Sequence, residues 1–219
     1  MNKFRSFFSL NPYYFAGLLL FFAVGFFFLW FYPKSEGFLF LNAHHGKFPD
    51  NFFIYFTNLG DGFFTVAIIL LLLITRRFFF AWQILTAFLI SGLLVQILKN
   101  LIYSPRPKEF FKLKEHIYLI EGVTHTGSSS FPSGHAASAF ALATLLALFA
   151  KNKKIGCLYL LAAALVGYSR IYLSQHFPLD VMAGALIGVF VALLVYFFFK
   201  TKSHRFGKKA ERNAIIPGG

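Results

Sequence analysis

The twelve residues 169–180, with the sequence SRIYLSQHFPLD, separate two long apolar segments of the chain. This stretch contains a guanidinium (Arg170), an imidazole (His176) and a carboxylate (Asp180). Ionisable groups at the ends of membrane spans cost several kcal/mol of desolvation, so a chain that keeps them usually has a use for them. Pro178 suits the first turn of a helix, and its position predicts that the last apolar helix begins there.

The spacing of His176 and Asp180 has two interpretations. Asp180, in the first turn of the predicted helix, can accept a hydrogen bond from the Nδ1–H of the imidazole and leave Nε2 free as a nucleophile. Alternatively, Asp180 only caps its own helix and His176 is an ordinary loop histidine. These two residues alone do not favour either interpretation.

The composition is that of a membrane protein. Of the 219 residues, 58% are hydrophobic and only 13% are charged. Soluble domains average roughly 45–50% apolar and about 25% charged residues, so a multi-span membrane protein is predicted. The formal net charge of +13 is also typical of nucleic-acid-binding proteins, so the positions of the charges decide its meaning. The single cysteine, Cys157, lies in an apolar run, which predicts a buried thiol and excludes an intrachain disulfide.

Hydropathy predicts an all-α protein, a six-transmembrane-helix bundle with short interfacial helices on its outer face. About twenty apolar residues are needed to cross a hydrocarbon core of ~30 Å. The predicted spans are residues 13–32, 62–75, 79–98, 133–150, 155–172 and 179–199. Asp61 is the expected N-cap of the second span. This span is short unless Arg76 and Arg77 extend their side chains to the membrane surface.

These spans form one membrane domain, residues 1–199. Residues 33–62 are rich in aromatic side chains but interrupted by polar ones, which predicts short amphipathic helices rather than a crossing. The polar stretch 100–131 has the length of a functional loop. Residues 200–219 are basic, and we expect a disordered cytoplasmic tail there.

The positions of the charged residues predict the orientation. Six spans place both termini on one side of the membrane. Of the 21 Lys and Arg and the 8 Asp and Glu residues, 13 basic and one acidic fall on that side, and 8 basic and 7 acidic fall on the other. The positive-inside rule therefore places both termini in the cytoplasm, which suits the inner membrane of a bacterium. The basic composition then reflects topology, and we expect neither a nucleic-acid partner nor an obligate protein partner.

Small residues indicate which spans form the interior of the bundle. The first span has seven phenylalanines and two alanines, whereas the fourth has seven alanines and two phenylalanines. Since small residues let helices approach closely, we expect the last three spans in the interior and the first span against lipid. Gly184 and Gly188 in the last span favour close packing within the bundle over a dimer interface.

Three polar clusters fall on the predicted outer face. The first holds Lys99 and Arg106 with Pro107, the second is the sequence PSGH at 132–135, and the third is the stretch 169–180. A phosphate monoester carries close to two negative charges, and its transition state spreads charge over the equatorial oxygens. The cations and helix start in these clusters suit such a group, so together they predict one phosphoryl-transfer site.

Positive charges and helix amides are expected to bind the phosphate. Lys99, Arg106 and Arg170 supply three cations, two of which are guanidinium groups that match phosphate geometry. Ser133 is the expected N-cap of the fourth span, so the amides of Gly134 and the following residue would point at an anion. Each residue also has a purely structural interpretation, as a membrane anchor or a cap, but their combination favours a phosphate site.

Two histidines then remain for covalent and proton-transfer chemistry. One attacks phosphorus, and the other protonates the leaving alkoxide. His176, with Asp180 as its partner, is the predicted nucleophile; His135, beside the anion site, is the predicted general acid and later the base that activates water. The outer carboxylates are scattered without paired spacing, so no metal and no other cofactor is predicted.

The sequence is similar to the type 2 phosphatidic acid phosphatase family, whose signature is K-x6-R-P, P-S-G-H and S-R-x5-H-x3-D. Here the three parts are KNLIYSPRP (99–107), PSGH (132–135) and SRIYLSQHFPLD (169–180), and all eleven fixed positions match. The resemblance implies His176 as the phosphohistidine nucleophile, Asp180 as its orienting partner and His135 as acid and base. It also implies a set of phosphate ligands: Lys99, Arg106, Ser133, Gly134 and Arg170.

The expected function is that of an integral-membrane, metal-independent lipid phosphatase that hydrolyses a phosphate monoester or diphosphate at the periplasmic face. Phosphatidic acid, phosphatidylglycerol phosphate, undecaprenyl diphosphate and lipid A 1-phosphate are candidate substrates. One alternative is a phosphotransferase that passes the phosphoryl group to another hydroxyl. Vanadium haloperoxidases also resemble the family, but they are typically soluble. A transporter should carry ionisable groups in mid-span, and the predicted spans are nearly free of them.

Overall fold

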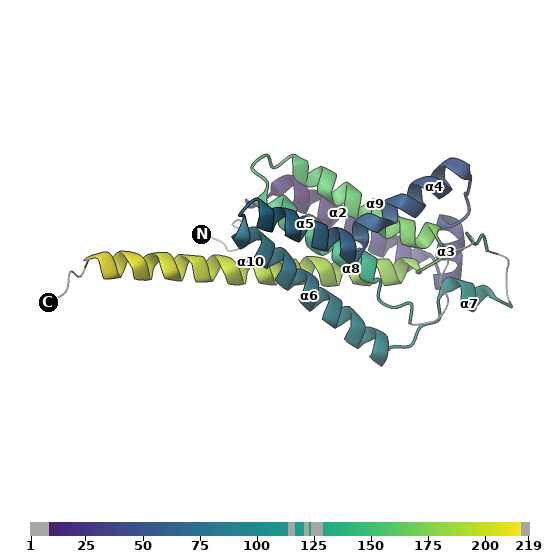
Figure 1. Ribbon diagram of the computed structural model, residues 1–219. Coiled ribbons are helices and arrows are strands. Elements are labelled where there is room, and N and C mark those ends of the chain that lie inside the picture. The colour runs from purple at the N-terminus through teal and green to yellow at the C-terminus, as the bar shows by residue number, and fades with distance from the viewer. Residues whose placement is uncertain (1–8, 114–116, 121–122, 124–128, 216–219) are drawn as a thin grey trace.

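The computed structural model describes residues 9–113, 117–120, 123 and 129–215, and from residue 202 onward it describes the backbone alone. These residues form a bundle of helices. The helices are α2 (Pro12–Phe31), α3 (Lys34–Leu41), α4 (Lys47–Phe56), η1 (Thr57–Gly60), α5 (Gly62–Ile74), α6 (Phe78–Leu101), α7 (Pro107–Phe111), α8 (Gly134–Phe149), α9 (Ile155–Tyr172) and α10 (Pro178–Ile215). Figure 1 shows their arrangement. The part of the chain that the structure describes contains no β-strand, so the all-α prediction is confirmed.

Three helices begin at residues that suit a helix start. Asp61 caps α5 by accepting a hydrogen bond from the amide of Phe63 (3.0 Å), and Ser133 caps α8 through the amide of Ala136 (3.3 Å). Helix α10 begins at Pro178, as predicted. These three starts lie toward the same end of the bundle (Figure 1). We call this the outer end, because it carries the predicted outer clusters.

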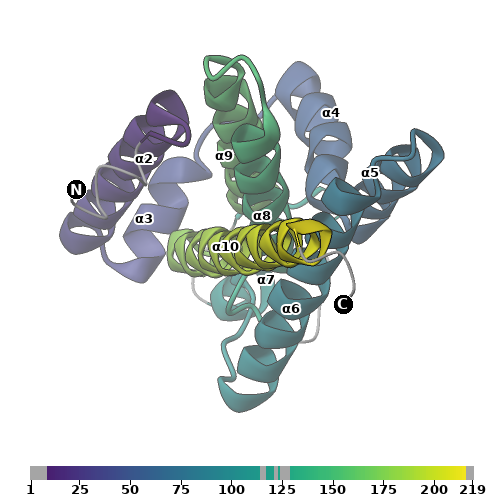
Figure 2. The same cartoon turned by 90° about the vertical axis from the view of Figure 1, so that its left-hand side faces the viewer.

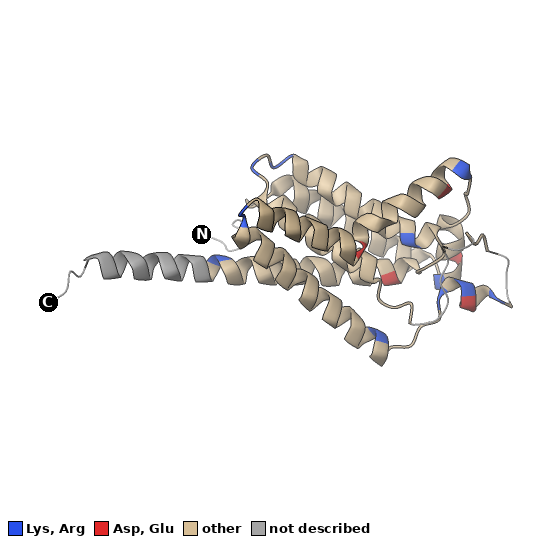
Figure 3. Ribbon diagram, viewed as in Figure 1, with Lys and Arg blue, Asp and Glu red and all other residues tan. Residues whose placement is uncertain are grey.

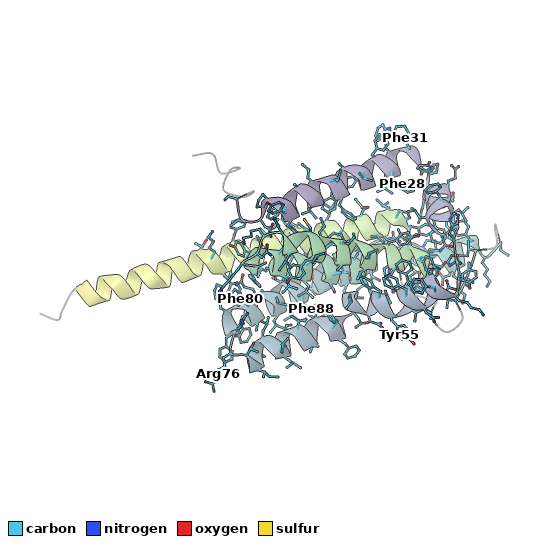
Figure 4. All side chains as sticks on the ribbon, turned by 90° about the horizontal axis from the view of Figure 1, so that it is seen from above. Phe28, Phe31, Tyr55, Arg76, Phe80 and Phe88 are labelled. Atoms are coloured by element: carbon cyan, nitrogen blue, oxygen red, sulfur yellow. The ribbon has the colours of Figure 1, made fainter. Side chains whose placement is uncertain are left out.

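Helix α8 forms the centre of the bundle. Eleven of its 16 residues are buried, whereas only three of the 20 residues of α2 are buried. In the end-on view of Figure 2, α8 lies in the middle of the other helices and α2 lies at the margin. Phe31, at the end of α2, points away from the bundle (Figure 4) and is 61% exposed. The structure therefore confirms that the fourth span lies in the interior and the first at the margin; α9 and α10 are half-buried, and contact of α2 with lipid stays a prediction.

Gly184 and Gly188 let α10 pack against α8. A Cβ on Gly184 would lie well inside 3.0 Å of the main-chain oxygen of Ser133, and a Cβ on Gly188 would lie equally close to that of Ala137. Both neighbours are backbone atoms, which cannot move aside like the end of a flexible side chain. The predicted use of this glycine pair within the bundle is confirmed.

Helix lengths do not confirm six separate spans. Of the described helices, four are long and apolar enough to cross a membrane: α2, α6, α9 and α10 up to Thr201. The number becomes five if α4–η1 and α5, which meet at 54°, form one broken span. Helix α5 has 13 residues and α8 has 16, which correspond to about 20 Å and 24 Å of helix against a hydrocarbon core of ~30 Å. Both helices have nearly the predicted bounds, so their short length was already present in the predicted spans 62–75 and 133–150.

The region 33–62 forms short helices, as predicted, and α4 is held against α9 at the outer end; the expectation that the region does not cross the membrane stays a prediction. Asp50 on α4 accepts hydrogen bonds from the hydroxyls of Tyr172 on α9 (2.5 Å) and Tyr118 (3.0 Å). These contacts fix α4 and the following η1 against α9. Thr57, the first residue of η1, is thereby placed beside the end of α9.

Charged residues are distributed unequally between the two ends of the bundle (Figure 3). The α5–α6 and α8–α9 turns carry Arg76, Arg77 and three lysines of 151–154, and the described acidic residues lie toward the outer end. Some of the residues that contribute to the predicted charge distribution lie outside the described residues: Lys3, Arg5, Lys114, Glu115 and Glu121. The orientation in the cell stays a prediction.

One expectation differs from the structure. Cys157 is exposed rather than buried, because it faces an apolar groove of about 580 Å³ between α2, α9 and α10. Helix α10 extends to Ile215, and the expected disorder of the tail stays a prediction.

Candidate active site

Hydrogen bonds join the three polar clusters at the capped end of α8. The amide of Ser133 donates to the main-chain oxygen of Asp180 (2.9 Å), which ties the start of α8 to the start of α10. Nη1 of Arg106 donates to the main-chain oxygen (3.2 Å) and to the side-chain oxygen (2.9 Å) of Gln175. The second and third clusters are thus linked directly, and the first is linked to the third through Gln175.

His176 lies in the loop between α9 and α10 and is 2% exposed. Its Nδ1 is 3.7 Å from Oδ2 of Asp180, which is too far for a hydrogen bond. Oγ of Ser130 lies 2.5 Å from that Oδ2 and 3.3 Å from Nδ1. The amide of Phe177 also donates to Oδ2 (2.8 Å). The direct imidazole–carboxylate hydrogen bond expected from the sequence is therefore absent, because Oδ2 already accepts from a hydroxyl and an amide.

Burial determines the charge of His176. Removal from water disfavours the charged imidazolium and lowers the pKa of His176 from 6.5 to about 4, although Asp180 opposes the change. The ring is therefore neutral at physiological pH. A neutral ring has a lone pair on one nitrogen, which is the form that can act as a nucleophile.

His135 occupies the first turn of α8 at the same end of the bundle. It is close enough to interact electrostatically with four other predicted site residues: Arg170, His176, Lys99 and Arg106. Its Nε2 is 3.7 Å from Oδ2 of Asp61, the N-cap of α5. The side chains of His135 and Asp61 are 29% and 38% exposed, so the site is open on this side.

The start of α8 leaves room for a ligand. The amides of Gly134 and His135 belong to the first turn, where N–H groups have no partner inside the helix. A Cβ on Gly134 would meet only the side chain of Val95, at 3.8 Å, so packing within the protein does not require glycine there. The absence of a side chain instead allows an anion to approach the backbone.

The site contains buried positive charge without an adjacent carboxylate. Arg170 is 6% exposed, and its Nη1 donates to Oγ1 of Thr57 (2.7 Å). Its Nε is buried and has no hydrogen-bond partner among the described residues. Nζ of Lys99 donates to the main-chain oxygen of Ser129 (3.1 Å). Within the described chain, neither Lys99 nor Arg170 has a carboxylate within 4.0 Å. Unpaired buried charges are costly, so this arrangement is suited to an anionic ligand.

The structure thus brings together all eight predicted site residues: Lys99, Arg106, Ser133, Gly134, His135, Arg170, His176 and Asp180. It adds Ser130, Thr57 and Gln175, which hold four of them and which the sequence analysis did not identify. Ser130 and Gln175 are close in sequence to predicted site residues, but Thr57 carries no sequence signal. Asp61 was identified only as a cap. Among the described residues, no three His, Cys, Asp or Glu side chains form a group that could hold a metal ion.

Comparison with known proteins agrees with the resemblance. The family model of the PAP2 superfamily matches residues 80–204. The bacitracin transport permease protein BcrC of Bacillus licheniformis is 42% identical over 110 residues, which cover 50% of this chain and 51% of that protein. The lipid A 4'-phosphatase of Bacteroides thetaiotaomicron is 28% identical over 190 residues, which cover 82% of this chain and 81% of that protein.

A solved structure shows a related fold. The crystal structure of Aquifex aeolicus LpxE superimposes with a TM-score of 0.67 at 35% sequence identity, and the match covers 76% of this chain and 96% of that one. The family model covers more than half of the chain and includes all three signature clusters. The protein therefore belongs to the PAP2 superfamily.

Proposed function

We propose that this protein is an integral-membrane lipid phosphatase that hydrolyses a phosphate monoester or diphosphate through a phosphohistidine intermediate. The observation that carries the proposal is the group of cations around a neutral His176, in which Arg106 and Arg170 are buried and Lys99 is partly buried. Lys99 and Arg170 have no carboxylate within 4.0 Å in the described chain, and Nε of Arg170 has no partner there. A phosphoryl group supplies the negative charge that these groups lack.

In the proposed reaction, Nε2 of His176 attacks phosphorus as the phosphorus–oxygen bond to the lipid breaks. His135 donates a proton to the leaving oxygen. Lys99, Arg106 and Arg170 stabilise the charge on the equatorial oxygens, together with the first amides of α8. His135 then removes a proton from water, which attacks the phosphohistidine and releases inorganic phosphate.

The proposed tail site lies along the outer half of α6. Leu94, Ile97 and Leu101 on this half are 38%, 44% and 75% exposed. Figure 1 shows α6 diverging from the rest of the bundle toward its outer end. A lipid tail there would lie against apolar side chains while its phosphate reaches His176.

The proposed location is the inner membrane, with both termini in the cytoplasm and the site on the periplasmic face. The basic α5–α6 and α8–α9 turns, opposite the site, support this orientation through the positive-inside rule. Similarity to a protein named lipid A 4'-phosphatase supports a lipid phosphate as substrate. The substrates to be tested are therefore a lipid A phosphate, undecaprenyl diphosphate, phosphatidic acid and phosphatidylglycerol phosphate.

The test uses purified protein in detergent with each lipid of the panel, and phosphate release is measured. His176→Ala should abolish release, and His44→Ala, which changes an exposed histidine outside the site, should leave it unchanged. With a labelled substrate, the wild-type chain should form an acid-labile phosphoenzyme that His176→Ala lacks. Equal phosphate release by the wild-type chain and by His176→Ala would show that His176 is not the nucleophile.

Two further arms separate the alternatives. We expect full activity in excess chelator, because side-chain cations supply the charge stabilisation; a loss that only a divalent metal restores would contradict a cation-only site. Product analysis with added lipid or sugar alcohols separates hydrolysis from transfer. Phosphorylated acceptor in place of inorganic phosphate would identify a phosphotransferase.

A further inference from the structure

Ser130 is fully buried (0% exposed) and contacts both His176 and Asp180. Its Oγ is 2.5 Å from Oδ2 of Asp180 and 3.3 Å from Nδ1 of His176, whereas these two atoms are 3.7 Å apart. We infer that Ser130 is a positioning residue that transmits the hydrogen bond of the Asp180 carboxylate to the His176 ring and keeps a proton on Nδ1. The inference deepens the proposed function, because it rests on His176 as the nucleophile.

The hydrogens of this group can be assigned from its geometry. A serine hydroxyl has one hydrogen to donate, and an ionised carboxylate can only accept. Since Oγ lies 2.5 Å from Oδ2 of Asp180, its hydrogen points to that oxygen. Oγ can then only accept from Nδ1 of His176, which must carry the proton of the neutral ring. Nε2 is left with the lone pair, as attack on phosphorus requires.

The backbone around Ser130 holds this hydroxyl in place. The amide of Ser130 donates to the main-chain oxygen of Ser104 (2.7 Å). The neighbouring Ser129 accepts from the amide of Ser104 (3.1 Å) and donates to the main-chain oxygen of Ile102 (2.7 Å). These residues lie within the segment KNLIYSPRP (99–107). The first signature cluster therefore has a second use, which is to position the residue that orients the nucleophile.

Ser130 also determines where charge moves during the reaction. As Nε2 forms its bond to phosphorus and the phosphorus–oxygen bond to the lipid breaks, the ring of His176 becomes positive and keeps its Nδ1 proton. The Asp180 carboxylate stabilises that charge through the Ser130 hydroxyl. If the proton were on Nε2, the ring would present an N–H to the substrate and could not attack.

The first measurement is the ring tautomer of His176 in the resting protein. The full chain, with ¹⁵N-labelled histidine, is studied in detergent without substrate, and the His176 signals are identified by their loss in His176→Ala. We expect the Nδ1–H tautomer in the wild-type chain and in Ser130→Thr, which keeps the hydroxyl. Ser130→Ala should populate the Nε2–H tautomer. Thr75→Ala, which removes an exposed hydroxyl from the α5–α6 turn at the opposite end of the bundle, should keep the Nδ1–H form.

The second measurement is the kinetics of the same variants. Loss of a residue that orients a reacting group typically costs about 10- to 100-fold, so kcat of Ser130→Ala should fall by that factor. KM should change little, because Ser130 contacts none of the proposed phosphate ligands. Ser130→Thr should restore most of kcat.

Three results would overturn the inference: an Nε2–H tautomer in the wild-type chain, an unchanged tautomer in Ser130→Ala, or an unchanged kcat in Ser130→Ala. If Ser130→Ala does not fold, the tautomer of the wild-type chain and the tautomer and kcat of Ser130→Thr still test the inference. Because the tautomer is measured without substrate, a wild-type chain that lacks phosphatase activity but shows the Nδ1–H form would refute the proposed function and not the positioning role.

Discussion

Replacement of Gly184 by alanine tests whether the contact between α8 and α10 sets the geometry of the site. A Cβ at this position would lie well inside 3.0 Å of the main-chain oxygen of Ser133 and 3.1 Å from Cβ of Ala136. Both neighbours are parts of α8, so the two helices must separate by on the order of 1 Å, since packed interiors have no free space. Ser133 also donates its amide to the main-chain oxygen of Asp180, so the separation acts directly on the site.

The structure gives the expected magnitudes. Overpacking of this kind typically destabilises by about 1–3 kcal/mol. A misplacement of about 1 Å in a reacting centre can lower the rate about 10²-fold. Gly184→Ala should therefore show both a lower midpoint of thermal unfolding and a roughly hundredfold lower kcat/KM. Gly188→Ala, one turn farther from Ser133, should lose similar stability but less activity.

Gly92→Ala is the matched control. A Cβ on Gly92 of α6 would meet no atom within 4 Å, so this variant should keep wild-type activity and unfold at the same temperature or a higher one. Phosphate release in detergent and thermal unfolding followed by circular dichroism measure the two effects. A Gly184→Ala protein with wild-type activity and stability would refute the claim that this contact holds the site together.

Two further predictions concern the charged groups of the site. Burial lowers the pKa of His176 to about 4 from 6.5, so NMR titration should find its ring neutral from pH 8 down to about pH 5. The same shift means that this group's contribution to stability is complete above pH 6.5 and is lost as the pH falls toward 4. A titration midpoint near 6.5 would contradict the burial argument. Thr57→Val removes the acceptor for Nη1 of Arg170. An unpaired buried donor costs about 1–3 kcal/mol, so the free energy of unfolding should fall by that amount. Inhibition by vanadate, which mimics the phosphate transition state, should also weaken, and an unchanged inhibition constant would show that Thr57 does not orient the guanidinium.

Much of this protein could be predicted from local sequence because the forces involved are local. Pro178, Ser133 and Asp61 begin their helices at the predicted places, since a fixed φ angle and a side-chain oxygen act within one turn. The alanine-rich fourth span lies in the interior and the phenylalanine-rich first span lies outside, as side-chain size predicts. The failed expectation depended on context: the exposure of Cys157 does not follow from hydropathy alone.

The sequence by itself therefore determined the family signature, the helices and the chemical groups available at the site. Only the tertiary structure decided how those groups are held. Ser130 lies 46 residues before His176, and Thr57 lies 113 residues before Arg170, yet each pair is in hydrogen-bond contact. Nδ1 of His176 and Oδ2 of Asp180 are 3.7 Å apart, which is too far for a hydrogen bond. This separation depends on where the loop before α8 packs, and no local sequence pattern encodes that position. Hydrogen bonds extend only about 3 Å, so the partners of a buried group are set by how distant segments pack together.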